Sequence, residues 1–405
     1  MHRPRLEFPE VLVMEILSKL PVRSLTRFNC VCKYWCSSFQ TPHFISKHHH
    51  NNLKNNNLNL LLIRCDGNNF QPYFSHLSNQ KDKQYIVKQK IHLPFFKSAT
   101  PSVHGACDGL LCLQESSTDK AAIWNPSTRE FRILPPSSIQ CPPYFSSIQE
   151  GRWNLVEVSF RHAAFGFDSK TDDYKVIRFV ALTFINSEDE HHFESQVELY
   201  SFRSDSWKEI PSPGYTLTHI FLGNNCVDGI CYWITECPVF HDFVGPILSF
   251  DMANEKFSIL SIPEFIGPFS ECCFNLLAFN GSLGVITYGS KGIDLWITSE
   301  GIWTKQYRIE SISGALWPLG FGKNDELFLR NIGTGEVLQF HPSTQELKKL
   351  EINTYLDNFQ YDTPLLHVYV ESLVRITGIQ EPKEHIIRQP IRDVSNKSKC
   401  EERSA

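Results

Sequence analysis

A short polar turn that recurs along the chain restricts its fold more than any other feature. Three copies have equal length, each running from an aromatic residue to an apolar one, and two further copies are shorter. The equal copies are Trp124–Phe131, Phe250–Phe257 and Phe340–Leu347, and the shorter ones are Phe202–Trp207 and Ile297–Trp303. Proline presets the first φ of a turn, and Ser, Thr, Asp and Asn side chains hydrogen-bond to its backbone. Each copy therefore predicts a tight connection between two antiparallel strands.

The spacing of these turns indicates a structural repeat. The residues that end the turns lie at positions 131, 207, 257, 303 and 347, so the last three intervals are 50, 46 and 44 residues. Such a period is typical of a β-propeller blade. Hairpin signals such as Asp108-Gly109, Asp228-Gly229 and Asn280-Gly281 precede the turns. Each unit is therefore expected to supply about four strands.

The first interval of 76 residues is too long for one blade, and two insertions, Cys141–Trp153 and Asn186–His192, account for the excess. Strands are also predicted at Leu58–Ile63 and Leu366–Val370, which have no such turn of their own. A blade assembled from both of these strands would close a ring. We expect an all-β, β-propeller-like domain of about six blades over residues 58–380, with a two-sheet β-sandwich as the alternative.

The start of the chain is predicted to be helical. Apolar residues recur at helical spacing over Glu10–Leu20, with Pro9 at the start of this segment and Pro21 at its end. Two shorter helices are expected at Ser24–Phe28 and Cys32–Phe39, because each carries apolar residues that can form one buried face. The whole chain is thus expected to be an α+β multidomain protein.

This three-helix module, residues 1–45, is too small and too apolar to stand alone. Its first helix is apolar nearly all round, because Val11, Leu12 and Met14 add to the helical stripe. Below about 70 residues a core rarely supplies more than ~3–5 kcal/mol. The missing cover is predicted to be another chain. The alternative is packing on the domain that follows a polar linker at residues 46–57.

The helical module resembles the F-box motif of plant F-box proteins. The match runs from Phe8-Pro9-Glu10 through Val13–Leu25 to Arg27–Trp35. The motif usually opens with Leu-Pro and an acidic pair, whereas this chain has a phenylalanine and one glutamate there. The resemblance implies a module that binds a Skp-family adaptor, which hangs on a cullin scaffold in an SCF ubiquitin ligase. By position, the residues that would form or support the adaptor interface are Pro9, Leu12, Ile16, Leu17, Leu20, Pro21, Leu25, Val31, Cys32 and Trp35.

A second resemblance covers nearly the whole chain outside the linker and the tail. Short strings in the expected strands and turns are similar to the F-box-associated region of plant F-box/kelch-like proteins. These strings are Gly109–Cys112, Ile123–Thr128, Ala164–Asp168, Asp173–Val176, Ser206–Lys208, Gly229–Trp233, Ile247–Asp251, Asp294–Trp296 and Tyr369–Leu373. Their spacing also resembles that of the S-locus F-box proteins of pollen, but the motifs are shared widely across the family.

No motif for catalysis, cofactor binding or a metal stands out. The chain has 13 Cys and 16 His, yet Cys30-Val-Cys32, Cys272-Cys273 and His48–His50 are spaced poorly for tetrahedral zinc. No Gly-x-Ser-x-Gly nucleophile elbow occurs, and Gly320–Asn324 lacks the full phosphate-binding spacing. We expect a non-catalytic protein with no cofactor and no metal site, in which the cysteines pack in the core and the histidine run is solvated.

The composition is that of a soluble protein. A net charge of −5 offers no basic surface for nucleic acid. The longest apolar runs are too short to span a bilayer, and Met1–Phe8 is not followed by the apolar segment of a secretory signal. We expect a cytoplasmic protein, with the nucleus as a second location, and reduced thiols. Residues 381–405 are charged, lack periodicity and are predicted to be disordered.

These features predict a substrate-recognition subunit, in which the helical module holds the adaptor and the β-domain holds a target protein for ubiquitination. Tyr144, Phe145 and Trp153, in the longer insertion, are candidate exposed anchors for that target, and packing over the outside of a blade is the equal alternative for them. The alternatives for the whole chain are a glycan-binding or enzymatic propeller, and an F-box scaffold that acts outside a ligase.

Overall fold

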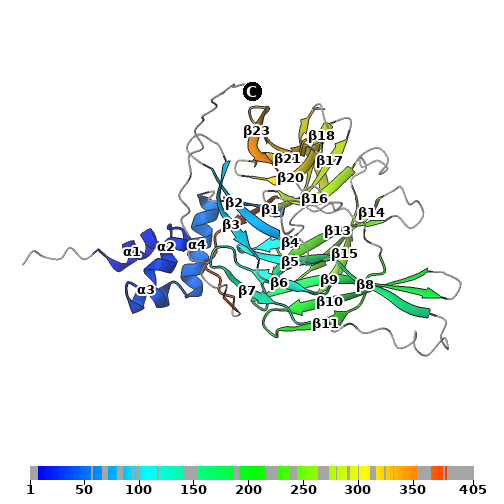
Figure 1. The fold of residues 1–405 in the computed structure, drawn as a ribbon, viewed down its shortest axis with the longest axis horizontal. Helices are drawn as coiled ribbons and strands as arrows, with labels where there is room; N and C mark the ends of the chain where they lie inside the picture. The colour runs from blue at the N-terminus through cyan, green and yellow to red at the C-terminus, as the bar shows by residue number, and fades with distance from the viewer. Residues whose placement is uncertain are drawn as a thin grey trace, which may run out of the picture.

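The structure of the protein is a computed structural model, in which a small group of helices lies beside a ring of β-sheets (Figure 1). It describes residues 8–55, 58–65, 72–79, 85–93, 95–96, 101–115, 118–137, 139, 153–186, 191–215, 217, 226–236, 244–262, 273–279, 281–289, 292–299, 301–310, 316–322, 325–331, 333–353, 366–376 and 379–380. The expected tail at 381–405 lies outside these residues.

The helical module has one more helix than predicted. Its helices are α1 (Glu10–Leu17), α2 (Val22–Phe28), α3 (Lys33–Ser38) and α4 (Pro42–Lys54). The first three match the predicted helices within a few residues. Pro9 and Pro21 lie directly before α1 and α2, where a missing N–H removes no helical hydrogen bond.

Helix α4 corrects the expectation of a polar linker at residues 46–57. The side chain of Thr41 caps the helix, since its Oγ1 accepts a hydrogen bond from the N–H of Phe44 at 3.3 Å, and a proline takes the first helical position. Phe44, His48 and Asn52 recur every four residues, and all three are buried. The helix is therefore held by one narrow face, and its largely polar composition hid this face in the sequence.

Six sheets form the β-domain, which is a six-blade β-propeller as predicted. Blade 1 contains β1 (Leu58–Cys65), β2 (Pro72–Asn79), β3 (Tyr85–His92) and β24 (Leu366–Val370), and blade 2 contains β4 (Ser102–Cys107), β5 (Leu110–Gln114), β6 (Ala121–Trp124), β7 (Glu130–Ile133) and β25 (Ile379–Gln380). Blade 3 contains β8 (Trp153–Asp168), β9 (Asp173–Asn186), β10 (His191–Ser201) and β11 (Ser206–Ile210), and blade 4 contains β12 (Cys226–Val227), β13 (Ile230–Glu236), β14 (Val244–Asp251) and β15 (Lys256–Leu260). Blade 5 contains β16 (Cys273–Phe279), β17 (Ser282–Gly289), β18 (Gly292–Ser299) and β19 (Ile302–Ile309), and blade 6 contains β20 (Leu316–Phe321), β21 (Leu327–Asn331), β22 (Glu336–His341) and β23 (Glu346–Asn353).

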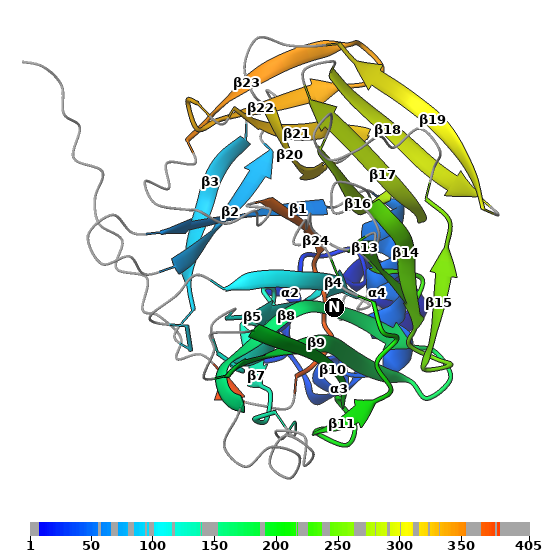
Figure 2. The ribbon, with the colours of Figure 1, turned by 90° about the vertical axis from the view of Figure 1, so that its right-hand side faces the viewer.

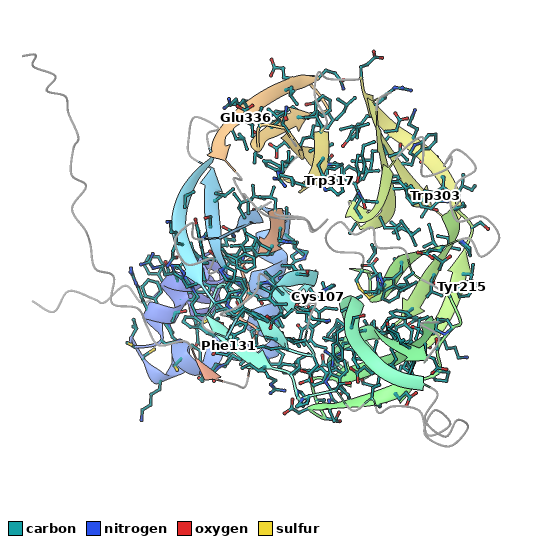
Figure 3. The ribbon with its side chains drawn as sticks, turned by 45° about the vertical axis from the view of Figure 1, so that its right-hand side comes forward. Cys107, Phe131, Tyr215, Trp303, Trp317 and Glu336 are labelled. Carbon is teal, nitrogen blue, oxygen red and sulfur yellow. A yellow bond between two sulfur atoms is a disulfide. The ribbon has the colours of Figure 1, made fainter. Side chains whose placement is uncertain are left out.

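The blades are held together by apolar side chains between neighbouring sheets. One buried cluster lies between each adjacent pair of blades, including blades 6 and 1. For example, the ring of Phe74 in blade 1 lies 5.1 Å from that of Trp124 in blade 2. Figure 3 shows side chains filling these spaces, with Trp317 of blade 6 nearer the centre than Trp303 of blade 5. Because each sheet has two apolar faces, burying all of them requires a closed ring.

The ring is closed by a blade built from both chain ends, as predicted. Strand β24 pairs antiparallel with β1, in a register that runs from Leu58 opposite Val370 to Leu62 opposite Leu366. Around this closure the sheets form a complete circle (Figure 2). The C-terminal part of the chain is thus needed to bury the inner edge and the faces of the first blade.

The recurring polar turns share one backbone conformation. Arg129, Asp205, Glu255 and Gln345 occupy the same place in four of them and have φ values of 67°, 51°, 52° and 58°. In three of these turns the N–H of this residue donates to the carbonyl four positions earlier. Non-glycine residues rarely adopt this conformation, so its repetition shows that the turns are equivalent in structure as well as in sequence.

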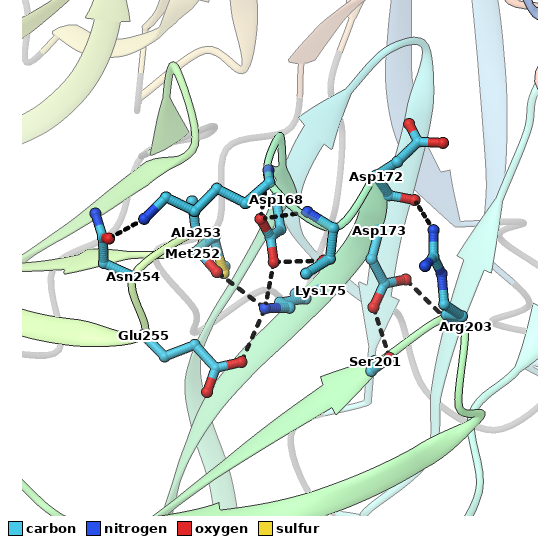
Figure 4. A network of polar contacts seen from close by, with 12 residues as sticks. Asp168, Asp172, Asp173, Lys175, Ser201, Arg203, Met252, Ala253, Asn254 and Glu255 are labelled. Carbon is cyan, nitrogen blue, oxygen red and sulfur yellow. Dashed lines mark hydrogen bonds and ion pairs between the residues drawn. The ribbon is translucent and has the colours of Figure 1, made fainter.

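An ion-pair network ties blade 3 to blade 4 (Figure 4). Lys175 Nζ donates to Asp168 Oδ2 at 2.6 Å, to Glu255 Oε1 at 2.8 Å and to the carbonyl oxygen of Met252 at 3.0 Å. Burial alone would raise the pKa of Asp168, but hydrogen bonds from Lys175, Thr171 and backbone N–H groups together lower it. The buried carboxylate therefore stays ionised and paired, and the network is a structural tie between blades.

A disulfide in blade 4 corrects the expectation that the thiols are reduced. Cys226 and Cys231 are bonded across the hairpin of β12 and β13, with their Cα atoms 4.0 Å apart. The Asp228-Gly229 turn places them directly opposite each other. Burial raises the pKa of the free thiol of Cys112 to about 12, which makes it unreactive.

Candidate partner-docking surfaces

The helical module has a small apolar interior of its own. Leu17, Leu25, Phe39 and Phe44 are buried together in it, and they come from all parts of the module. Further apolar side chains are partly buried around this cluster: Val13, Met14, Leu20, Phe28, Trp35 and, from the C-terminal part of the chain, Leu373. The interior therefore accounts for one side of α1 and leaves the other side without cover from the described residues.

The uncovered side of the module carries exposed apolar residues. Leu12 and Ile16, one helical turn apart on α1, are 51% and 58% exposed, and Val11 is 76% exposed. Val31, between α2 and α3, is 59% exposed. Several large apolar side chains exposed on one small module are typical of a surface that meets a partner. We call these four residues the docking patch.

The ten residues predicted for the adaptor interface fall into three groups. Leu17 and Leu25 lie in the interior and can only support an interface. Leu20 and Trp35 are half-buried against the interior. The exposed members of the predicted set are Pro9, Leu12, Ile16, Pro21, Val31 and Cys32. Val11 is not in the predicted set, although its apolar character outside the helical stripe was a signal for it.

A buried histidine connects α4 to the residues that follow α1. His48 Nε2 donates to the carbonyl oxygen of Leu20 at 2.9 Å, and Asn51 Nδ2 donates to Ser18 Oγ at 2.8 Å. Burial lowers the pKa of His48 from its ordinary value of 6.5, and the bond to Leu20 opposes this effect only in part. The histidine run predicted to be solvated therefore supplies a neutral, structural histidine at its first position.

The lowered pKa of His48 predicts that the helical module is less stable at acidic pH. Because the folded module binds a proton at His48 less readily than the unfolded chain does, its contribution to stability is complete above the ordinary pKa of 6.5 and declines as the pH falls below it. Hydrogen exchange at α1–α4, corrected for intrinsic rates, should therefore be faster at about pH 5.5 than at about pH 7.5. The variant His48→Gln, whose amide can still donate to Leu20, should show a smaller change. An equal change in the variant would contradict this role.

The helical module lies on one face of the ring. Strands alternate in direction within each blade. Counted outward from the centre of the ring, the turns that follow the first and third strands therefore lie on one face, and the end of β24, the innermost strand of blade 1, lies there too. His49 Nε2 in α4 lies 3.7 Å from Asp108 Oδ1, in the turn between β4 and β5. Figure 2 shows the helices behind the ring. We call this the module face and the opposite one the far face.

Blade 3 extends beyond the other blades on the far face. Strands β8, β9 and β10 continue as a three-stranded extension, visible on the side of the ring away from the helices (Figure 1). Its apolar side chains, Phe160, Val180, Leu182 and Phe184, are buried together with Ile139 packed on them. The extension is thus a folded, three-stranded element with an apolar interior of its own.

Two of the predicted target-binding residues cannot be located, and the third is in a strand. Tyr144 and Phe145 lie outside the described residues. Trp153, predicted to end a loop insertion, begins β8 and pairs with Asn186 of β9. The two ends of the second insertion belong to strands as well: Asn186 ends β9, and His191 begins β10 and pairs with Ile185. Strand pairing reaches these positions because alternate apolar residues of β8 and β9, such as Phe160 and Leu182, are buried in the extension.

A cavity of about 260 Å³ lies at the centre of the ring. It is lined mainly by apolar residues and glycines of the inner strands β4, β16, β20 and β24, and by β17, with Asp325 and His367 as its titratable lining residues. Within the described parts of the chain, no three His, Cys, Asp or Glu side chains are grouped to hold a metal ion. None of the helices described here is long and apolar enough to cross a membrane.

Comparison with known proteins identifies both parts of the chain. The family described as the F-box associated beta propeller domain matches residues 56–376, and the F-box domain matches residues 6–47. The F-box protein CPR1 of Arabidopsis thaliana is 26% identical over 367 residues, which cover 85% of this chain and 84% of that protein. The F-box protein At3g07870 of the same plant is 26% identical over 341 residues, covering 78% of this chain and 75% of that protein.

Proposed function

The chain belongs to the family of F-box proteins that carry an F-box associated β-propeller domain, and from this premise we propose that it is the substrate-recognition subunit of an SCF-type ubiquitin ligase. The helical module would dock a Skp-family adaptor, which connects to a cullin scaffold. The propeller would bind a target protein. The observation that supports this proposal best is the docking patch, an apolar surface on the F-box that no described part of the chain covers.

In this role the chain needs no covalent chemistry of its own. Holding a target lysine near a ubiquitin-loaded conjugating enzyme replaces a bimolecular encounter by an effectively intramolecular one. F-box proteins are generally non-catalytic adaptors of this kind. The chain's contribution to the rate would be the binding of two partners at a defined separation.

The docking patch is expected to supply most of the affinity for the adaptor. Affinity in an interface usually depends on a few desolvated apolar anchors, each worth roughly 2 kcal/mol or more. Leu12 and Ile16 fit this role because their side chains are exposed on one helical turn. Leu17 and Leu25 would act indirectly, by keeping the module folded behind the patch.

The first test is capture of a purified Skp-family adaptor by the full-length chain. Replacing Leu12 and Ile16 with aspartate should weaken capture by about 30-fold or more, the equivalent of one lost anchor, without unfolding the module. Ile259→Asp and Ile302→Asp are matched controls, because these isoleucines are 53% and 68% exposed on the propeller. Normal capture by the Leu12/Ile16 variant would rule out docking through this surface.

The target is proposed to bind on the far face. The long extension of blade 3 belongs to this side of the ring, and in the sequence the connection that contains Tyr144 and Phe145 leads directly into it at Trp153. A target held there would lie across the ring from the adaptor. Recognition by connections on a rigid scaffold is the usual arrangement in such domains.

The far-face proposal predicts that target choice can be transferred. Residues 141–152 and 187–190 would be replaced by the corresponding segments of the F-box protein CPR1, with all strands kept. The proteins conjugated to ubiquitin through the hybrid chain, identified by mass spectrometry, should then match those of CPR1. Exchange of turns on the module face, such as residues 125–129 and 252–255, is the control. If target choice followed the control exchange instead, the far face would not be the target site.

A further inference from the structure

The chain crosses from the propeller to the helical module a second time, near its C-terminal end. After β24 the backbone runs over the module face as an irregular segment, residues Glu371–Ile376, before β25 joins the outer edge of blade 2. We call Glu371–Ile376 the strap. It lies between the two parts of the molecule and contacts both.

Two strap residues contact the helical module. Glu371 Oε2 accepts a hydrogen bond of 2.8 Å from the backbone N–H of Val22, the first residue of α2. This N–H has no partner within its own helix, so the carboxylate satisfies it. The side chain of Leu373 packs against the buried cluster that contains Leu17 and Leu25. The interior of the F-box is therefore completed by a residue from the far end of the sequence.

Other strap residues are fixed to blade 2. Asn125 Nδ2 donates to the carbonyl oxygens of Ser372 at 3.1 Å and Val374 at 2.8 Å. The N–H of Ile376 donates to Glu130 Oε2 at 2.9 Å, and the side chain of Ile376 is buried between blades 2 and 3. The strap thus alternates between contacts with the propeller and contacts with the module, so neither part can rotate without breaking them.

The turn beneath the strap leaves no space between the two. A Cβ atom on Gly109 would lie 2.2 Å from the carbonyl oxygen of Val370 and 2.5 Å from Cβ of Ser372, and its φ is +78°. The glycine therefore permits both the turn and the close approach of the strap. The neighbouring Asp108 also faces His49 of α4, so the same small area joins turn, strap and module.

The helical module is joined to the propeller covalently at one place, the short connection from Lys54 at the end of α4 to Leu58 at the start of β1. The strap adds a non-covalent attachment. One connection would leave the module free to swing, whereas a second, non-covalent attachment restricts rotation as well as distance. We propose that Glu371 and Leu373 are positioning residues for ubiquitin transfer: they hold the F-box in one orientation on the propeller, so that a docked adaptor and a bound target keep a fixed separation. The effect on ubiquitin transfer rests on the proposed function, whereas the fixed orientation of the module does not.

The geometry is tested first in the free, full-length chain. Spin labels on unnatural amino acids at Lys33 of α3 and Ile302 of β19, both exposed, report the distance between the module and the propeller. The chain should give one narrow distance distribution. Glu371→Ala combined with Leu373→Ala should broaden it by about twofold or more, since both of the strap's contacts with the module are lost. An unchanged narrow distribution in the double variant would overturn the proposal.

Two control variants separate positioning from loss of folding. Arg375 lies in the same strap, but its side chain is 56% exposed and faces Glu130 of blade 2 rather than the module. The variant Arg375→Ala should therefore keep the narrow distance distribution. Glu371→Gln keeps an oxygen that can accept the hydrogen bond from the N–H of Val22. With Leu373 intact, this variant should show nearly the narrow distance distribution of the unmodified chain. Broadening by Arg375→Ala equal to that of the double variant would contradict a specific role for Glu371 and Leu373.

The consequence is tested with a surrogate target, because a reporter can be placed on the far face. A short epitope inserted at residues 187–190, between β9 and β10, would bind a lysine-bearing nanobody, and ubiquitin transfer to it would be measured with purified adaptor, cullin complex and conjugating enzyme. The double variant should capture adaptor and nanobody as the unmodified chain does, yet transfer ubiquitin roughly fivefold more slowly or worse. Equal transfer rates would refute the positioning role. Failure of the unmodified chain to capture the adaptor would instead refute the proposed function, while the distance measurement would still decide whether the strap fixes the module.

Discussion

The burial of two apolar faces on every blade is the constraint on which the rest of the structure depends. Each sheet of the propeller can bury its faces only against its neighbours, and one apolar cluster fills each of the spaces between them. The ring must therefore close, and it closes through β24, a strand from near the C-terminal end that pairs with β1. This closure carries the following segment onto the module face, where Leu373 reaches the interior of the F-box.

The closed ring also separates the two surfaces on which a receptor depends. Because strands alternate in direction, the helical module and the extension of blade 3 fall on opposite faces. The module that carries the docking patch is also attached to the strap, because Glu371 accepts a hydrogen bond from the N–H of Val22. A scaffold of this kind can keep two partners apart by a defined distance, which is the property that proximity catalysis requires.

Local sequence signals predicted the propeller well, because turns are specified by residues close together in the chain. The polar turns and the Asp-Gly pairs gave the blades, and two unmatched strands gave the closure. Helix α4 was missed because its buried face is narrow and includes His48 and Asn52, which are polar. The strap was missed because Leu373 and Glu371 act on residues about 350 positions earlier, a contact that no local pattern encodes. The predicted adaptor set combined interior residues such as Leu25 with exposed ones such as Ile16, because position in the motif does not tell buried apolar residues from exposed ones.

The central claim is that one chain joins a ligase scaffold at its F-box to a target at its propeller. The most direct measurement is capture of the tagged full-length chain from its native cells with degradation blocked, followed by cross-linking and mass spectrometry of the captured complex. The account predicts that an adaptor cross-links to α1, that a cullin is present, and that a protein conjugated to ubiquitin cross-links to the far face of the ring. Recovery of partners on the propeller with neither an adaptor nor a cullin would contradict it.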